Sequence, residues 1–181
     1  MKLTAIAAAL FAAGALFAAT SFGAMTKDAY KSEKSRISAE YKSDIKRCGS
    51  LSGNAKDVCK AEVKAKQKTA NADAFAAYKG TDKAATAALI ARADADFSVA
   101  KEKCDDQSGN AKDVCVKDAK AAHTKAKVDA QANQKVSEVR KEATQDKRDA
   151  SYAASKERCD ALAGDAKTQC INEAKARFGK S

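Results

Sequence analysis

One cysteine-containing segment occurs three times in this chain and limits what the chain can fold into. The copies read RCGSLSGNAKDVC at residues 47–59, KCDDQSGNAKDVC at residues 103–115 and RCDALAGDAKTQC at residues 158–170. The letters SGNAKDVC are identical in the first two copies, and each copy holds two cysteines with ten residues between them. Such self-similarity indicates a repeat architecture, in which similar units follow one another and pack on their neighbours.

The first residues indicate the compartment in which these cysteines lie. Residues 1–23, MKLTAIAAALFAAGALFAATSFG, combine one early charge, Lys2, with a short apolar run and then small residues. This is the pattern of a secretory signal peptide, with cleavage expected after Gly23 and with Ser21 or Ala24 as alternative ends. A retained membrane anchor is the other interpretation, but the run is short and alanine-rich for the roughly 20 apolar residues that span a bilayer. We therefore expect a periplasmic or secreted protein, with no membrane span once the signal peptide is removed.

An even number of cysteines in an exported chain predicts disulfide bonds. Six cysteines allow 15 pairings. The pairing that repeats with the sequence joins the two cysteines inside each copy: Cys48 with Cys59, Cys104 with Cys115, and Cys159 with Cys170. Each disulfide should stabilise its unit by about 3 kcal/mol in the chain-entropy model. Metal binding and thiol redox catalysis are the alternatives, but ten intervening residues match neither zinc-finger nor C-x-x-C spacing, so we expect no metal and no cofactor.

The residues between the cysteines predict a turn from one helix into the next. Each copy has a glycine, which can adopt a positive φ without steric cost, at Gly53, Gly109 and Gly164. The residue that follows each glycine is a strong helix N-cap, and these residues are Asn54, Asn110 and Asp165. We therefore predict that a helix arrives at the first cysteine and a new helix leaves with the second, so that each unit is a cross-linked helical hairpin.

Strong helix formers fill the rest of each unit, and the chain contains no proline. We predict five helices, near residues 26–48, 54–79, 82–104, 110–158 and 165–178, with Gly80 ending the second of them. The fourth helix would be long because neither glycine nor proline interrupts it. Units centred on residues 41–66, 97–122 and 152–177 make residues 24–181 a single helical repeat region.

The core of this architecture is predicted to be thin. Large aliphatic residues are sparse, so alanine must fill many buried positions and little apolar area is buried per residue. In the fourth helix, apolar residues recur at three and four positions with Asp146 among them: Val136, Val139, Ala143, Ala150 and Ala153. An aromatic residue precedes the first cysteine of each copy by two helical turns, at Tyr41, Phe97 and Tyr152. The predicted fold class is all-α, an elongated rod or loose bundle of helical hairpins cross-linked within each repeat.

The sequence contains no pattern typical of a reaction centre. Asp105 and Asp106 are adjacent, but successive residues point apart, which favours a solvated loop pair over paired catalytic carboxylates. His123, the single histidine, has polar neighbours and is expected to be an exposed residue rather than a metal ligand. There is no nucleophile elbow, phosphate-binding glycine loop or metal-ligand motif. We therefore expect a protein that is not an enzyme.

Three motifs resemble a known group of sequences. YKSDIKRC at residues 41–48, the two copies of SGNAKDVC, and AKARFGKS at residues 174–181 are similar to segments of exported, alanine- and lysine-rich cysteine-repeat proteins of Gram-negative bacteria. These are sometimes labelled TolA-like cell-envelope-biogenesis proteins. The resemblance extends over nearly the whole chain and implies a helical protein of the cell envelope.

The charge of the chain adds a second functional hypothesis. A net charge of +10 would let an exported protein bind anionic lipid phosphates or cell-wall polymers, although acids are interleaved with the bases, as on a solvated helix surface. Nucleic acid is not an expected partner, because of export and because no aromatic stacking platform accompanies the lysines.

Two functions of different classes follow. The first is a non-enzymatic structural or interaction protein of the cell envelope, whose hairpins self-associate or dock a helix of a protein partner. The second is a basic module that binds an anionic envelope ligand. A thiol-redox role is a more distant alternative, because it requires a disulfide that is reduced more easily than a structural one.

Overall fold

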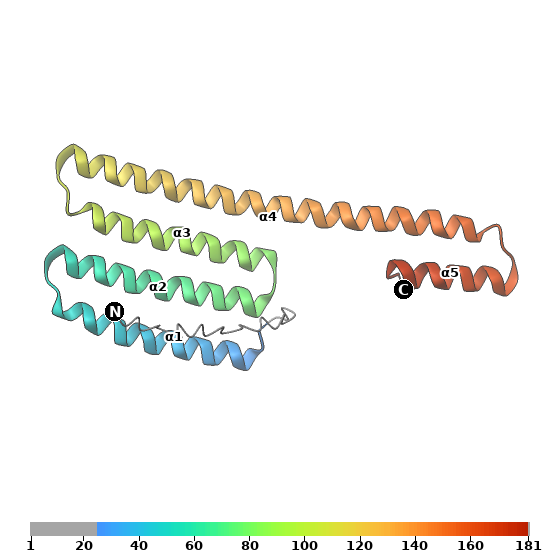
Figure 1. The fold of residues 1–181 in the computed structure, drawn as a ribbon, viewed down its shortest axis with the longest axis horizontal. Helices are drawn as coiled ribbons and strands as arrows, with labels where there is room; N and C mark the ends of the chain where they lie inside the picture. The colour runs from blue at the N-terminus through green and yellow to red at the C-terminus, as the bar shows by residue number, and fades with distance from the viewer. Residues whose placement is uncertain (1–24, 181) are drawn as a thin grey trace, which may run out of the picture.

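The computed structural model describes residues 25–180 and consists of α-helices joined by short turns (Figure 1). The α-helices of this part of the chain are α1 (Lys27–Arg47), α2 (Gly53–Lys79), α3 (Asp82–Cys104), α4 (Gly109–Cys159) and α5 (Gly164–Phe178), and a short 3-10 helix, η1 (Cys48–Ser50), follows α1. The predicted all-α class and the five helices are therefore confirmed. The signal peptide expected at residues 1–23 lies outside the described residues.

Helix α4 is continuous over 51 residues, which gives it a length of about 76 Å at about 1.5 Å per residue. It contains no proline, and its one glycine is its first residue, Gly109. Nothing in its sequence therefore interrupts the ladder of backbone hydrogen bonds. The helix joins the second cysteine pair of the chain to the third.

Each helix packs only on the helices that precede and follow it in the chain. The pairs in contact are α1 with α2, α2 with α3, α3 with α4, and α4 with α5, and no other pair of α-helices within residues 25–180 is in contact. Figure 1 shows that α1, α2 and α3 lie side by side with the first half of α4, whereas α5 lies along its other end. The described chain is thus a single layer of helices, and the prediction of an elongated molecule with neighbour contacts is confirmed.

The break between α2 and α3 follows the predicted chemistry. Gly80 ends α2 in the left-handed conformation, with φ of 60°, where a residue without a Cβ has no steric cost. Thr81 then caps α3, since its hydroxyl accepts a hydrogen bond from the Ala84 N–H at 3.2 Å. The two helices can therefore reverse direction within two residues.

The predicted N-caps Asn54, Asn110 and Asp165 are wrong by two positions. The preceding glycines do have positive φ, as predicted, with values of 55° to 59°, but the helices begin at these glycines and not after them. The N-cap residues are instead Ser52, Ser108 and Ala163, none of which makes a side-chain cap hydrogen bond. The physical reason is that a glycine in the left-handed region turns the chain early enough for the carbonyl before it to accept the first helical bond, as Ser52 does from the Lys56 N–H at 3.4 Å.

The buried side chains are small, as the composition predicted. Cys48, Cys104 and Cys159 are fully buried, and Ile37 is the only buried large aliphatic residue of the described chain. The other buried apolar residues are alanines: Ala74, Ala84, Ala88, Ala93, Ala95, Ala130 and Ala174. Four of these belong to α3, which lies between α2 and α4, and their small side chains let both neighbours approach closely.

Candidate functional site

The three disulfides link the two helices of each hairpin at its turn. Their Cα–Cα distances are 5.6, 5.7 and 5.7 Å, and the described residues contain no free cysteine. The predicted pairing within each repeat is confirmed: Cys48 with Cys59, Cys104 with Cys115, and Cys159 with Cys170. Three disulfides in a small helical chain are typical of a protein that folds in an oxidising compartment.

An ion pair reinforces two of the cross-linked turns. Lys112 lies 2.8 Å from the Asp105 carboxylate, and Lys167 lies 2.8 Å from Asp160 at the equivalent place in the third repeat. The Lys167 ammonium lowers the pKa of the Asp160 carboxyl, and Asp105 raises the pKa of Lys112. Asp105 therefore closes a turn, and its sequence neighbour Asp106 makes no hydrogen bond through its side chain among the described residues.

A second set of polar contacts joins neighbouring helices along the layer. Asp94 of α3 lies 2.7 Å from the His123 imidazole and 3.9 Å from Lys127, both on α4, and 3.4 Å from Lys68 on α2. One carboxylate therefore ties together three helices. The hydrogen bond from His123, with the charges of the two lysines, lowers the pKa of Asp94.

An aspartate with a lowered pKa also lies at the α1–α2 and α4–α5 interfaces, and a second one joins α3 to α4. Between α1 and α2, Lys66 lies 3.0 Å from Asp44. Asp82 accepts hydrogen bonds from Ser137 and Lys141 of α4, both at 2.7 Å. These donors lower the pKa of each carboxyl. Near α5, Lys180 lies 2.5 Å from Asp149 and has the same effect.

The expectation that His123 is exposed is wrong. Its side chain is only 18% exposed, and its ring stacks on Phe97 with the centroids 4.9 Å apart. The residue lies on the face of α4 that packs on α3, at helical spacing from Ala119, Ala126 and the buried Ala130. That spacing was the signal in the sequence, because a residue in register with an alanine stripe faces the same neighbour.

The aspartate contacts predict how the protein responds to acid. The free energy of unfolding should fall as the pH falls below about 4. A carboxyl whose pKa is lower in the folded state stabilises the protein above its unfolded-state pKa, and this stabilisation is lost as the pH falls through its folded-state pKa. Thermal unfolding followed by circular dichroism from neutral to acid pH measures this. Asp94→Asn should lower Tm at neutral pH and flatten the acid decrease, whereas the control Asp106→Asn should behave as the wild type. If Tm of Asp94→Asn followed the same pH dependence as that of the wild type, the Asp94 contacts would not stabilise the folded protein.

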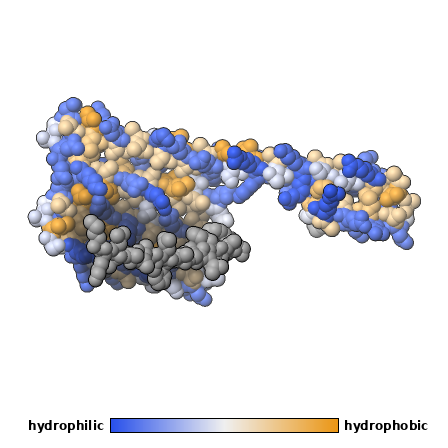
Figure 2. Space-filling view, viewed as in Figure 1, coloured by the Kyte–Doolittle hydropathy of each residue, from blue (hydrophilic) through white to orange (hydrophobic). Residues whose placement is uncertain are grey.

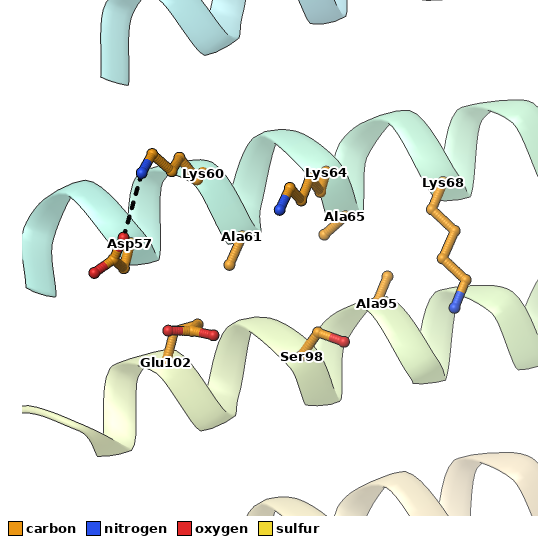
Figure 3. A pocket seen from close by; sticks show the side chains of 9 residues that line it. All are labelled: Asp57, Lys60, Ala61, Lys64, Ala65, Lys68, Ala95, Ser98 and Glu102. Carbon is orange, nitrogen blue, oxygen red and sulfur yellow. Dashed lines mark hydrogen bonds and ion pairs between the residues drawn. The ribbon is translucent and has the colours of Figure 1, made fainter. Parts of the chain in front are cut away.

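One groove runs along the face of the layer between α2 and α3 (Figure 3). Its volume is about 500 Å³, and small residues such as Ala61, Ala65 and Ala95 line it. Figure 3 shows three lysines spaced by one helical turn along α2, namely Lys60, Lys64 and Lys68. Two of them are neutralised, because Lys60 pairs with Asp57 and Lys68 with Asp94. The groove is therefore electrostatically mixed.

A second open surface lies on the middle of α4, between the part of the helix that packs on α3 and the part that packs on α5. The face of α4 that packs on α3 through Ala130 and on α5 near Cys159 becomes polar and basic between these contacts. The resulting hollow has a volume of about 590 Å³ and contains no acidic residue in its lining: Asn133, Val136, Ser137, Arg140, Lys141, Thr144, Gln145 and Arg148. We call this surface the α4 notch. Asp82 of α3 already pairs with Lys141 at the α3 end of the notch, but Arg140 and Arg148 make no ion pair among the described residues, so their end of the notch suits an anionic group.

Comparisons with known proteins identify no relative of this chain, since no family model, curated protein or solved structure matches it. Within residues 25–180, no helix is both long and apolar enough to cross a bilayer. The same part of the chain has no cluster of three or more side chains that could hold a metal ion.

Proposed function

We propose that this protein is a non-enzymatic helical scaffold of the cell envelope, which presents helices to protein partners in the periplasm. One observation carries the proposal: the helices form a single layer in which each packs only on its chain neighbours. Disulfides at the turns and aspartate contacts between the helices hold this layer without a large core. Within residues 25–180, no further helix covers the two faces of this layer, so these faces are available for binding.

The sequence supports the location of this scaffold. The pattern of residues 1–23 is that of a secretory signal peptide, and three disulfides suit an oxidising compartment. The motifs YKSDIKRC and AKARFGKS resemble those of exported cysteine-repeat proteins of the Gram-negative envelope. None of these features requires catalytic chemistry.

Photo-crosslinking in living cells tests the proposal. The full chain, with its own N-terminus, would carry a benzophenone amino acid at Ser98 on the layer face or at Val128 on α4. We expect mature protein in the periplasmic fraction and adducts of higher mass at one or both positions. A protein that stays in the cytoplasm, or that reaches the periplasm and gives no adduct at any exposed position, would contradict the proposal.

The α4 notch favours one alternative function, which is binding of an anionic envelope ligand. The probe is a vesicle that contains phosphatidylglycerol, with retention measured by co-sedimentation at low and high salt. We expect Arg148→Glu to reduce retention at low salt several-fold, because it reverses the charge inside the notch. Arg158→Glu, which changes net charge equally outside the notch, is the matched control. Equal losses for the two variants would mean that only overall charge matters, and no retention at low salt would exclude this function.

A further inference from the structure

The outer edge of α4 is an exposed apolar stripe that no other part of the described chain covers. Helix α4 packs on α3 and α5 through one side, which includes the buried Ala130 and Cys159. At about 100° per residue, the opposite side carries a series of valines and alanines: Val114, Ala121, Val128, Ala132, Val139, Ala143 and Ala150. We call this side the α4 edge.

Large apolar side chains concentrate on this edge and beside it. Four of the eight large apolar side chains that are exposed in the described residues belong to α4, namely Val114, Val128, Val136 and Val139. Val128 is 56% exposed and Val139 is 61% exposed. Figure 2 shows apolar surface at several points along α4, between hydrophilic areas. Exposed apolar residues gathered along one helix face indicate a protein–protein contact.

The edge also has a shape that can receive side chains. A shallow depression of about 580 Å³ lies on its N-terminal half, with Ala121, Thr124 and Val128 among its lining residues. Lys117, Lys120, Lys125 and Asp129 surround these residues. The C-terminal half of the same edge carries acidic residues along one flank: Glu142, Asp146 and Asp149.

The charges that flank the edge reverse sign near the middle of α4. On one flank, Lys117 and Lys120 lie in the N-terminal half, and Glu142 and Asp149 lie in the C-terminal half. On the other flank the order is inverted, with acids first and bases later: Asp118 and Asp129, then Arg140 and Lys147. Asp129 also pairs with Lys125 of its own helix. An identical helix placed in the antiparallel direction meets opposite charges on both flanks, because each flank then faces the same flank of the second copy in reverse order.

We propose that two copies of this protein associate through the α4 edge, as an antiparallel pair of α4 helices whose two-fold axis passes near the middle of the helix. This register brings Asp129 near Arg140 of the second copy, and Asp118 near Lys147. It also places Val128 opposite Val139 twice in one interface. Because α3 and α5 lie on the other side of α4, the two layers would continue each other without a clash.

The partner that binds the α4 edge is a second copy and not another protein, because the charge pattern of the edge is complementary to itself. Arg140, Lys147 and Asp118 make no ion pair among the described residues, so they are free to pair between chains. Lys135 and Asp146 interrupt the stripe, and we therefore expect a dissociable dimer rather than a permanent one. This inference depends on the proposed scaffold function and specifies its partner.

Sedimentation velocity of the oxidised full chain, from roughly 10 to 500 μM, tests the proposal by following the conversion of monomer to dimer. We expect Val128→Asp with Val139→Asp to weaken the dimer at least tenfold. Leu162→Asp, at an exposed apolar residue away from the edge, is the control and should leave it unchanged. A chain that stays monomeric throughout this range, or a dimer that the double variant does not weaken, would overturn the proposal.

A charge exchange distinguishes a weakened dimer interface from a variant that fails to fold. Arg140→Glu with Lys147→Glu should weaken the dimer by like-charge repulsion, and adding Asp118→Lys with Asp129→Lys should restore it. Weakening without restoration would overturn the antiparallel register. The photo-crosslinker at Val128 separates this inference from the scaffold proposal: adducts between two copies support it, whereas adducts only with other envelope proteins overturn the dimer and leave the scaffold function standing.

Discussion

Replacing Cys159 and Cys170 together with serine will release α5 from the rest of the molecule. Helix α5 contacts only α4. Besides the disulfide, it is held by the ion pair of Lys167 with Asp160, the edge-on pair of Tyr152 with Phe178 and the contact of Lys180 with Asp149. The disulfide contributes about 3 kcal/mol. An isolated helix of 15 residues is marginal in water, because nucleation is costly and few hydrogen bonds follow it. The third hairpin should therefore open as a unit.

Amide hydrogen exchange followed by mass spectrometry measures this result segment by segment. We expect protection to be lost in residues 164–178 and the last turns of α4, while residues 27–104 keep wild-type protection. The matched variant replaces Cys104 and Cys115, and it should instead lower protection where α3 meets α4. If either variant lowered protection uniformly along the chain, the layer would be one cooperative core and the neighbour-only architecture would be wrong.

Ile37→Ala will give the largest loss of stability of any single substitution outside the cysteines. Ile37 is 2% exposed and lies against α2 beside Tyr41, Val63 and Ala70. Removing such a side chain from a packed site costs about 2–5 kcal/mol. Because α1 is an outer helix with one neighbour, the loss should appear mainly as detachment of α1.

Urea unfolding gives the change in free energy, and hydrogen exchange locates it. The control is Leu89→Ala, which removes a comparable side chain that is 49% exposed and should change stability by about 0.5 kcal/mol or less. Similar losses for the two variants would mean that burial at Ile37 contributes little and that the disulfides and ion pairs alone hold α1.

The local features of this fold could be predicted from the sequence because they depend on short-range chemistry. The repeated Cys48 to Cys59 spacing identified the disulfides, and the run from Asn110 to Cys159 without glycine or proline predicted one long helix. The N-caps were misplaced at Asn54 and its equivalents because a left-handed glycine begins the helix two residues earlier than the side-chain chemistry suggests. The side chain of Asn54 instead donates a hydrogen bond to the Glu102 carbonyl at 3.1 Å.

The contacts between helices could not be predicted in the same way. Asp94 and His123 are 29 residues apart, and nothing near either residue in the sequence specifies the register that joins them. That register is set by close packing of alanines on α3 against both neighbours, which is a property of the assembled layer. The α4 notch was missed for the same reason, since its basic residues become notable only where α3 and α5 leave the helix uncovered.

Small-angle X-ray scattering of the oxidised protein tests the central claim, an open layer of helices built on one uninterrupted α4. An open layer has a maximum dimension of at least about 75 Å, set by 51 helical residues at about 1.5 Å each, and an antiparallel dimer would not shorten it. A compact globule of the same chain would have a radius of gyration of about 15 Å. A value near that, with a maximum dimension well below the length of α4, would contradict the account.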